Sequence, residues 1–199
     1  YDVVLCNATH LYLDLAGAKD PEEIGYYWAG FVGDRKPFEF DPLNVFNNAT
    51  SDGMGRPLVE GKFAGSVRLS DEGRRHILGI QGQLWGENLR SAEHLEYMAF
   101  PRTIAVAERA WAQEPEWARE TNRKTRGQKV DAAWNHFANC LGQRELPRLD
   151  YLCGGIHYRL PPPGAVTVEG SIQANVAFPG LEIRYSTDGT DSTSTSALY

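Results

Sequence analysis

The sequence lacks any long apolar run. None of its 199 residues belongs to a stretch approaching the roughly 20 consecutive apolar residues that a membrane-spanning helix needs. Its start, Tyr1-Asp2-Val3, also lacks the basic region and apolar core of a secretory leader. A membrane span is therefore not expected. Because the chain begins without Met and passes directly into strand-like residues, we expect the rest of its own polypeptide to lie upstream of Tyr1.

Cysteine is scarce, and its positions do not form a metal-binding motif. The three cysteines are Cys6, Cys140 and Cys153, an odd number without metal-ligand spacing. Cys140 and Cys153 could pair in an oxidising compartment, but the sequence favours free, buried thiols. Neither a metal nor an organic cofactor is expected.

The chain also lacks an excess of positive charge. It has 20 Lys and Arg against 26 Asp and Glu, intermixed along the sequence, for a net charge of −6. This balance argues against a phosphate-binding surface, so nucleic acid is not an expected partner, whereas neutral or cationic partners remain open. A hydrophobic content of 42% is enough to bury the core of one domain, or of one domain and part of another.

The most informative stretch that is present runs from His76 to Trp111. An apolar segment, residues 77–80, leads into a glycine-punctuated segment that contains Trp85 and Glu87, and a long amphipathic run follows. This order predicts a strand that feeds a helix, with Trp85 and Glu87 in the connection between them. Pro101 predicts a kink or a restart within the helical run.

The pair Trp85 and Glu87 suits sugar recognition. An indole face can lie against the C–H face of a pyranose, while a carboxylate accepts hydrogen bonds from the ring hydroxyls. The alternative is structural: Trp85 covers the core, and Glu87 stabilises the start of the following helix as an acid in its first turn. Residue spacing alone leaves both interpretations open.

The N-terminal segment predicts a second strand and a second group of polar residues. Residues 2–6 are apolar and β-branched without alternation, which is typical of a strand covered on both faces in a parallel sheet or barrel. Tyr12 and Asp14 follow at positions i and i+2, on one side of an extended segment. Asp20-Pro21-Glu22-Glu23 predicts the start of a helix that leads to the aromatic residues around Trp28.

His10 lies beside this group, and we expect it to be a satisfied polar residue near the rim of the sheet without a ligand role. Residues 31–68 follow with no helical or strand periodicity and many turn-forming residues. An irregular segment of this length in a compact domain tends to be functional, for instance as a wall of a binding cleft.

A helix is predicted over residues 128–141, ending at Gly142.

The composition changes at residues 158–164, Tyr-Arg-Leu-Pro-Pro-Pro-Gly, which predict a stiff, extended linker. Beyond it, period-two alternation predicts three strands joined by turns, at residues 165–168, 171–176 and 181–187.

In order and spacing, these motifs resemble glycoside hydrolase family 20, the β-N-acetylhexosaminidases, and the bacterial chitobiases in particular. The resemblance starts at about Asp2, extends over most of the chain and is carried above all by residues 79–87, 96–102 and 105–111. It implies an α/β fold, with the C-terminal part of a (β/α)8 TIM barrel over residues 1–157 and the Pro-rich linker at 158–164. Residues 165–199 would begin an immunoglobulin-like β-sandwich, which needs around seven strands and is incomplete here.

The resemblance also implies an activity, the hydrolysis of terminal non-reducing N-acetylhexosamine residues by a substrate-assisted, retaining mechanism. Tyr12 would be catalytic through the acetamide oxygen, while Asp14, Trp28, Trp85 and Glu87 would bind the substrate. The implied partners are chitobiose-like oligosaccharides that contain N-acetylglucosamine, and the sequence leaves gluco- and galacto-configured sugars open. The implied location is periplasmic, outer-membrane-associated or secreted.

The general acid of this family belongs to an Asp-Glu pair that follows a His-x-Gly-Gly-type segment. The one Asp-Glu in this chain, Asp71-Glu72, lacks that context and falls at a predicted loop or helix cap, so we expect the general acid to lie outside residues 1–199. Two alternatives remain. The chain is a carbohydrate-binding module without catalysis, or it is an unrelated α/β domain in which Trp85 is buried and far from Tyr12.

Overall fold

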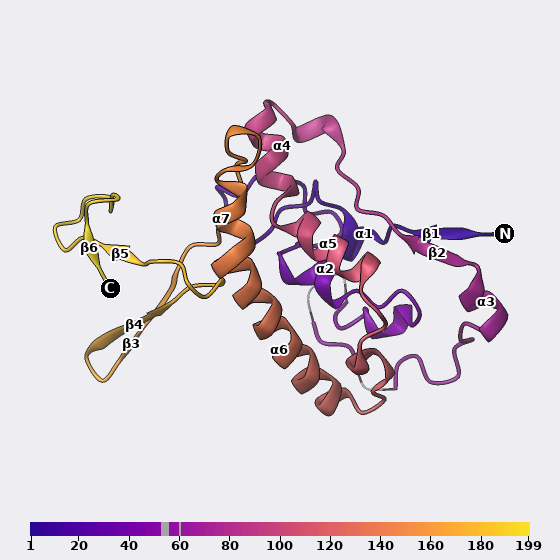
Figure 1. Cartoon of the computed structure of the whole chain (residues 1–199). Coiled ribbons are helices and arrows are strands. Elements are labelled where there is room, and N and C mark those ends of the chain that lie inside the picture. Colours follow the sequence, from indigo (N-terminus) through magenta and orange to yellow (C-terminus); the bar gives the residue numbers. More distant parts are fainter. Residues whose placement is uncertain (53–55, 60) are drawn as a thin grey trace. The chain divides into compact units, whose positions relative to one another are not determined.

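A computed structural model describes residues 1–52, 56–59 and 61–199 of the chain (Figure 1). The chain forms two compact units, residues 1–134 and 135–199. The division falls inside the long helix α6 (Arg123–Cys140). The domain division at the proline-rich linker stays a prediction.

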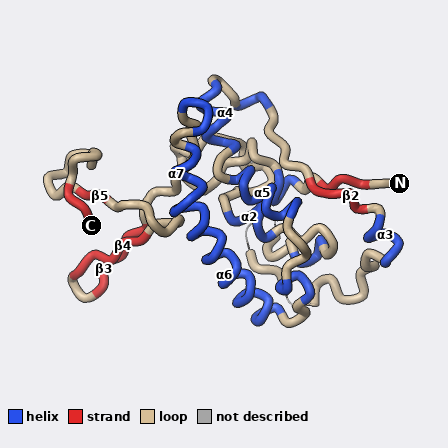
Figure 2. Tube along the Cα trace, in the orientation of Figure 1, coloured by secondary structure: helices blue, strands red, loops and turns tan. Residues whose placement is uncertain are grey.

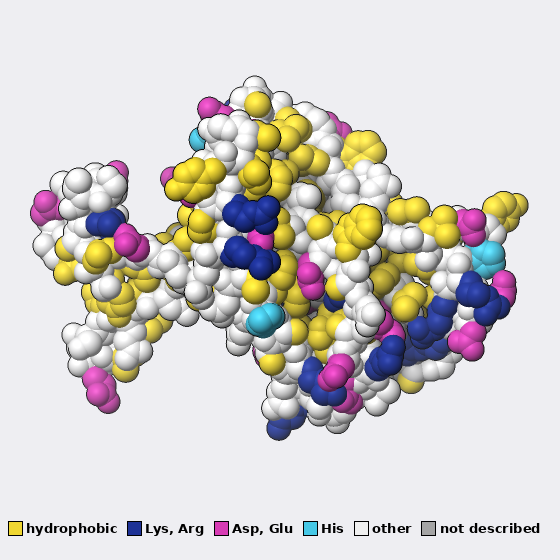
Figure 3. Space-filling view, viewed as in Figure 1, with side chains coloured by type: hydrophobic (Ala, Val, Ile, Leu, Met, Phe, Trp, Pro, Cys, Tyr) yellow, Lys and Arg dark blue, Asp and Glu magenta, His cyan; other side chains and the backbone are white. Residues whose placement is uncertain are grey.

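The N-terminal unit contains one pair of parallel strands, β1 (Val3–Leu5) and β2 (Ile77–Ile80), which lie side by side near the N-terminus in Figure 2. Both strands were predicted, and their parallel pairing agrees with the expected barrel topology. Within these residues the expected cover on both faces is not present, since Val4 is 47% exposed and Leu78 is 65% exposed. Figure 3 shows hydrophobic side chains open to solvent along this edge.

The core of this unit lies between short helices. Helices α1 (Ala8–Leu11) and α2 (Arg35–Glu39) pack together, and α2 also packs against α5 (Arg102–Trp111). The buried apolar side chains at their centre include Leu11, Leu13, Leu15, Val32, Phe38, Phe40, Met98 and Ala105. Short helical segments complete the unit at α3 (Asp71–Arg75), η1 (Val45–Asn47), η2 (Gly86–Asn88) and η3 (Glu116–Arg119).

The helical run after Trp85 is interrupted as predicted. Helix α4 (Ala92–Ala99) begins after Ser91, whose hydroxyl accepts a hydrogen bond from the backbone N–H of His94 at 3.2 Å. The helix ends before Pro101, and α5 starts at the next residue. The restart at Pro101 is confirmed, and it follows from the proline ring, which cannot continue the preceding helix.

The helix predicted to begin at Asp20 does not form. The Asp20 carboxylate accepts a hydrogen bond from the backbone N–H of Glu22 at 2.9 Å and so closes a turn, and Tyr26 then pairs with Leu15 in parallel. Gly25 has a φ of +130°, and a Cβ at this position would lie 2.5 Å from the backbone nitrogen of Ala16. An aspartate before proline caps turns as well as helices, which is why the sequence signal was misleading.

The second unit begins with the last part of α6, and here a predicted helix end is wrong. Helix α6 starts at Arg123 rather than Gln128. The helical path continues past Gly142 through a π-helical segment, η4 (Leu141–Glu145), into α7 (Leu146–Leu149). Gly142 is needed for close packing and not for a helix end, because a Cβ there would lie 2.1 Å from the carbonyl oxygen of Pro179.

After a short turn, η5 (Leu152–Gly154), the second unit contains two antiparallel strand pairs. Strands β3 (Gly164–Val168) and β4 (Ser171–Asn175) form a hairpin, while β5 (Arg184–Tyr185) pairs with β6 (Ala197–Leu198). The first two predicted strands are confirmed, and the third is shorter than predicted. Cys140 and Cys153 are free, as the sequence favoured, but Cys140 is only partly buried and Cys153 is exposed, so the expectation of buried thiols is wrong.

Candidate functional site

Three aromatic rings that are distant in sequence meet in the N-terminal unit. The ring of Tyr12 lies 6.3 Å from that of Trp85 and 5.8 Å from that of Trp28, measured between centroids. Trp85 is 48% exposed and Trp28 is 66% exposed, so both indoles present surface to solvent. The structure therefore brings together Tyr12, Trp85 and Trp28, all of which were predicted site residues.

Backbone pairing beyond the two strands explains this meeting. The parallel pairing of β1 with β2 continues in a bridge between Tyr12 and Gln83, with Leu13 donating to the Gln83 carbonyl at 2.6 Å. Trp85 follows two residues later and is thereby brought beside Tyr12. The backbone N–H of Tyr26 donates to the Asp14 carbonyl at 3.1 Å. This hydrogen bond places the segment that ends in Trp28 next to Tyr12.

Two carboxylates accompany the aromatic rings. Asp14 is only 3% exposed, and its Oδ1 atom has no hydrogen-bond partner among the described residues. Burial raises the pKa of Asp14, and the negative charge of Glu87 raises it further, against the opposing effect of hydrogen bonds and of the Arg102 guanidinium. Glu87 is exposed in η2. The site thus offers one buried acceptor and one solvent-facing carboxylate near the same aromatic rings.

Arg102, a buried residue next to Asp14, was not among the predicted site residues. It is 1% exposed, and its guanidinium donates to the backbone carbonyls of Leu13 and Leu15, on either side of Asp14. One signal was available in the sequence: Arg102, Ala105 and Arg109 lie on the same face of α5, and all three are buried. Arginines in phase with a buried alanine on an amphipathic helix indicate buried cations.

His10 is a satisfied residue, as predicted. It is 3% exposed, and its Nδ1 forms a hydrogen bond with the Thr9 hydroxyl at 2.9 Å. Desolvation by burial, together with the charge of Lys36, lowers the pKa of His10 to about 3.

The depressed pKa of His10 predicts a pH-dependent stability. Because the folded-state pKa lies below the ordinary value of about 6.5, the stabilisation is fully present above pH 6.5 and is lost as the pH falls towards 3. At pH 5 the loss should be about 2 kcal/mol, from ~1.5 pH units at ~1.36 kcal/mol each. Urea unfolding of the chain at pH 7 and pH 5 measures this loss.

The matched comparison is His10→Gln, which keeps a polar side chain that does not titrate. Its free energy of unfolding should fall by about 2 kcal/mol less between pH 7 and pH 5 than that of the unchanged chain. His76→Gln serves as the control, because His76 is partly exposed beside Asp2. An equal pH dependence in the unchanged chain and His10→Gln would contradict the assignment.

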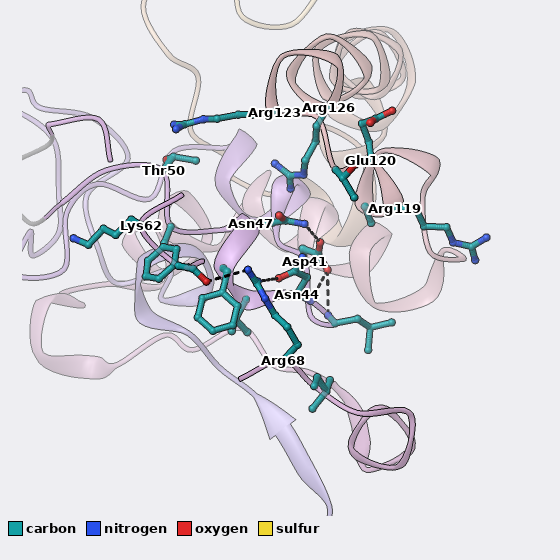
Figure 4. A pocket seen from close by; sticks show the side chains of 18 of the residues that line it. Asp41, Asn44, Asn47, Thr50, Lys62, Arg68, Arg119, Glu120, Arg123 and Arg126 are labelled. Atoms are coloured by element: carbon teal, nitrogen blue, oxygen red, sulfur yellow. Dashed lines mark hydrogen bonds between the residues drawn. The ribbon is translucent and has the colours of Figure 1, made fainter. Parts of the chain in front are cut away.

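A separate cavity of about 1250 Å³ lies elsewhere in the N-terminal unit (Figure 4). Much of the predicted irregular stretch lines it, including parts of residues 41–50 and 61–68, so the prediction that this stretch walls a cleft agrees with the structure. The predicted site residues Tyr12, Asp14, Trp28, Trp85 and Glu87 do not line it.

Among the charged side chains that line this cavity, basic residues outnumber acidic ones. The basic residues are Lys62, Arg68, Arg74, Arg119, Arg123 and Arg126, and the acidic residues are Asp41, Glu114 and Glu120. Arg68 donates to the Asn44 side chain and lies over the ring of Phe46, at 4.3 Å from its centroid, while Arg123 donates to the Leu58 carbonyl. Asp41 accepts from Leu43, Asn44 and Asn47 and so fixes the loop that forms one wall. These contacts organise the loop, and none of them reaches the aromatic site.

Two further features are absent among the residues with described coordinates, a metal-binding group and a membrane-spanning helix. Within them, no group of three or more His, Cys, Asp or Glu side chains is placed to hold a metal ion. No helix in that part of the chain combines the length and the apolar character needed to cross a membrane.

Two family models match the chain. "Glycosyl hydrolase family 20, catalytic domain" matches residues 1–114, and "Chitobiase/beta-hexosaminidase C-terminal domain" matches residues 145–198. Together they account for most of both compact units.

Individual relatives of the chain are also chitobiases and beta-hexosaminidases. The chain is 39% identical to the N,N'-diacetylchitobiase of Vibrio harveyi over 95% of its own length and 22% of that protein. It is 38% identical to a beta-hexosaminidase of Vibrio vulnificus, over 95% of this chain and 23% of the relative. Among solved structures, the GH20 beta-N-acetylhexosaminidase of Streptomyces coelicolor A3(2) is 25% identical, with a TM-score of 0.51 over 81% of this chain and 24% of the other.

The chain spans about a fifth of the length of these curated relatives. The predicted α/β fold is confirmed as part of a TIM barrel followed by residues that match a chitobiase-type C-terminal domain. The alternative of an unrelated α/β domain is excluded, since Trp85 is half-exposed and lies beside Tyr12. The match over residues 1–114 shows that the chain belongs to glycosyl hydrolase family 20.

Proposed function

We propose that this chain forms part of a β-N-acetylhexosaminidase and contributes the residues that bind the terminal non-reducing sugar and stabilise its acetamide. The observation that carries the proposal is the meeting of Tyr12 with two solvent-facing indoles, Trp85 and Trp28. Family membership supplies the reaction class, and the arrangement of the side chains supplies the roles.

Each side chain has a part in this proposal that follows from its chemistry. The Tyr12 hydroxyl donates a hydrogen bond to the acetamide oxygen and so orients this oxygen for its attack on the anomeric carbon. Trp85 stacks on the pyranose, and Trp28 extends the aromatic surface towards a second sugar. Glu87 and Asp14 accept hydrogen bonds from sugar hydroxyls. The free Oδ1 atom of Asp14 supports this part, because a buried acceptor without a partner is costly unless a ligand satisfies it.

Chitobiose-like oligosaccharides are the proposed substrates, and the name of the Vibrio harveyi relative, N,N'-diacetylchitobiase, supports this choice. A periplasmic, outer-membrane-associated or secreted location belongs to the same proposal and rests on resemblance alone. Separating the producing cells into compartments and assaying each for the protein tests it.

The proposal assigns the general acid to a part of the polypeptide outside these residues. Asp71 and Glu72 occupy the first turn of α3, where the Ser70 hydroxyl caps the helix by accepting from the Gly73 N–H at 3.1 Å. Glu72 also pairs with Arg75 and His76 in an exposed cluster. These contacts support a capping role for the Asp-Glu pair.

The purified 199-residue chain should therefore not hydrolyse an aryl N-acetyl-β-glucosaminide, while the longer protein that carries it should. General acid catalysis typically supplies about 10²–10⁴-fold, and without the acid the bound sugar has no proton donor for its leaving group. Release of nitrophenol over time, with buffer as the baseline, measures both proteins.

Three outcomes separate the possibilities. Steady turnover by the chain itself would place the acid within it and return Asp71-Glu72 to consideration. Binding of N-acetylglucosamine by the longer protein without hydrolysis would favour a carbohydrate-binding module. Neither binding nor hydrolysis by the longer protein would remove the proposed function altogether.

A further inference from the structure

Arg102 makes an unusual set of contacts for a buried cation. Its Nη1 donates to the carbonyls of Leu15 at 2.7 Å and Val32 at 2.9 Å, and its Nη2 donates to the carbonyl of Leu13 at 2.7 Å. Its Nε donates to the carbonyl of Met98 at 3.0 Å, one turn earlier in the chain. One guanidinium thus joins three separate backbone segments.

Two of these segments carry the candidate site. The carbonyls of Leu13 and Leu15 flank Asp14 and follow Tyr12 directly, and Val32 lies just beyond the segment that contains Trp28. These segments are short and irregular here, and Leu13 and Asp14 lie in a turn. Backbone N–H groups of Leu13, Tyr26 and Val32 already tie these segments to their neighbours, and Arg102 adds donors for the carbonyls of Leu13, Leu15 and Val32.

The anchor must be arginine for geometric reasons. A guanidinium presents five N–H donors in a rigid planar fork, so it can bridge carbonyls on different segments at fixed angles. A lysine ammonium has three donors at a single point and can preserve the charge but not the span. Because the guanidinium is rigid, the position of α5 determines where the backbone carbonyls on either side of Asp14 lie.

We propose that Arg102 is a positioning residue for the site: its guanidinium holds the Tyr12–Asp14 turn in register with the segment that carries Trp28. This inference rests on the proposed function and adds to it a residue that acts through Tyr12 without touching the sugar. Small displacements of the Tyr12 hydroxyl are costly, because the hydrogen bond that aligns the acetamide oxygen depends steeply on distance and angle.

Arg109 provides a matched control on the same helix. It is also a buried arginine, 7% exposed, on the same face of α5. Its guanidinium lies over the ring of Trp117 at 5.3 Å and shares charge interactions with Asp41. Arg109→Lys therefore perturbs a buried cation of the same helix away from the Tyr12 loop.

The test is a double-mutant cycle in the longer protein that carries this chain, with Arg102→Lys and Tyr12→Phe alone and together. Arg102→Lys should lower kcat about 10- to 30-fold with little change in KM. In the Tyr12→Phe background the same substitution should cost less than about threefold, because the hydroxyl that it displaces is already gone. Arg109→Lys should leave kcat within about threefold of the unchanged protein.

Additive effects of the two substitutions would overturn the proposal, since Arg102 would then act independently of Tyr12. Failure of both Arg102→Lys and Arg102→Gln to yield folded protein would also overturn it, because the arginine would then be needed for the fold as a whole. If the unchanged protein binds N-acetylglucosamine without hydrolysing it, the hydrolase assignment fails separately. The double-mutant cycle then compares the Kd of N-acetylglucosamine among the same variants. An unchanged protein that neither binds nor hydrolyses would end both proposals.

Discussion

Replacing Tyr12 with phenylalanine in the protein that carries this chain is expected to lower kcat about 10²–10³-fold, because its hydroxyl aligns the attacking acetamide oxygen and the misplacement of a reacting group can cost about 10²-fold or more. KM should change little, because this alignment matters most in the transition state, as the acetamide oxygen forms its bond to the anomeric carbon. The ring itself would remain between Trp28 and Trp85, so packing of the aromatic cluster should be preserved. Steady-state kinetics with an aryl N-acetyl-β-glucosaminide measures both constants.

Tyr27→Phe is the matched control for this prediction. Tyr27 is 74% exposed and stacks on Phe31 with 6.4 Å between ring centroids, so it belongs to the neighbouring surface and not to the Tyr12 cluster. Its loss of a hydroxyl should leave kcat unchanged. An unchanged kcat in Tyr12→Phe as well would make Tyr12 a packing residue.

Replacing Trp85 with alanine should raise KM about 10- to 100-fold. Covering a large apolar side chain contributes roughly 1.5–3 kcal/mol, and each 1.4 kcal/mol corresponds to about tenfold in affinity. Trp85 is suited to give this contribution because 48% of its surface is open in the absence of a sugar. Trp111→Ala is the control, because Trp111 is 90% exposed at the end of α5.

The two outcomes for Trp85 are distinguishable in one titration. If sugar stacks on the indole, N-acetylglucosamine should quench tryptophan fluorescence in the unchanged protein and in Trp111→Ala, but to a smaller extent in Trp85→Ala. The same quench and the same KM in all three proteins would assign Trp85 to the scaffold.

The meeting of Tyr12 and Trp85 could be predicted from the sequence, whereas for Trp28 the resemblance predicted a place in the site but the backbone path to it was not predicted. The first meeting follows from two apolar segments that read as neighbouring parallel strands, because residues after such strands share one edge of the sheet. Trp28 was expected on a helix from Asp20. It reaches Tyr12 by backbone pairing of Tyr26 with Leu15, in which the Tyr26 N–H donates to the Asp14 carbonyl, and Gly25 permits the close approach to Ala16 at this point.

Arg102 illustrates what a single sequence conceals. Its acceptors are backbone carbonyls, which every residue has, and Leu13 and Val32 are remote from it in the chain. Residue identity therefore carries no trace of these contacts, although the helix phase of Arg102 and Arg109 does indicate burial. Gly142 was misread in the opposite way. The sequence indicated a helix end at this glycine, but a glycine is required there because Pro179 approaches closely.

The proposed roles of Tyr12, Trp85 and Glu87 require that one sugar lies against all three side chains. A crystal structure of the longer protein with N-acetylglucosamine measures this. It should place the pyranose on the Trp85 indole, the acetamide oxygen about 2.5–3.0 Å from the Tyr12 hydroxyl, and a ring hydroxyl within hydrogen-bond distance of Glu87. A sugar bound elsewhere, with the Tyr12 hydroxyl directed into the protein, would contradict the account.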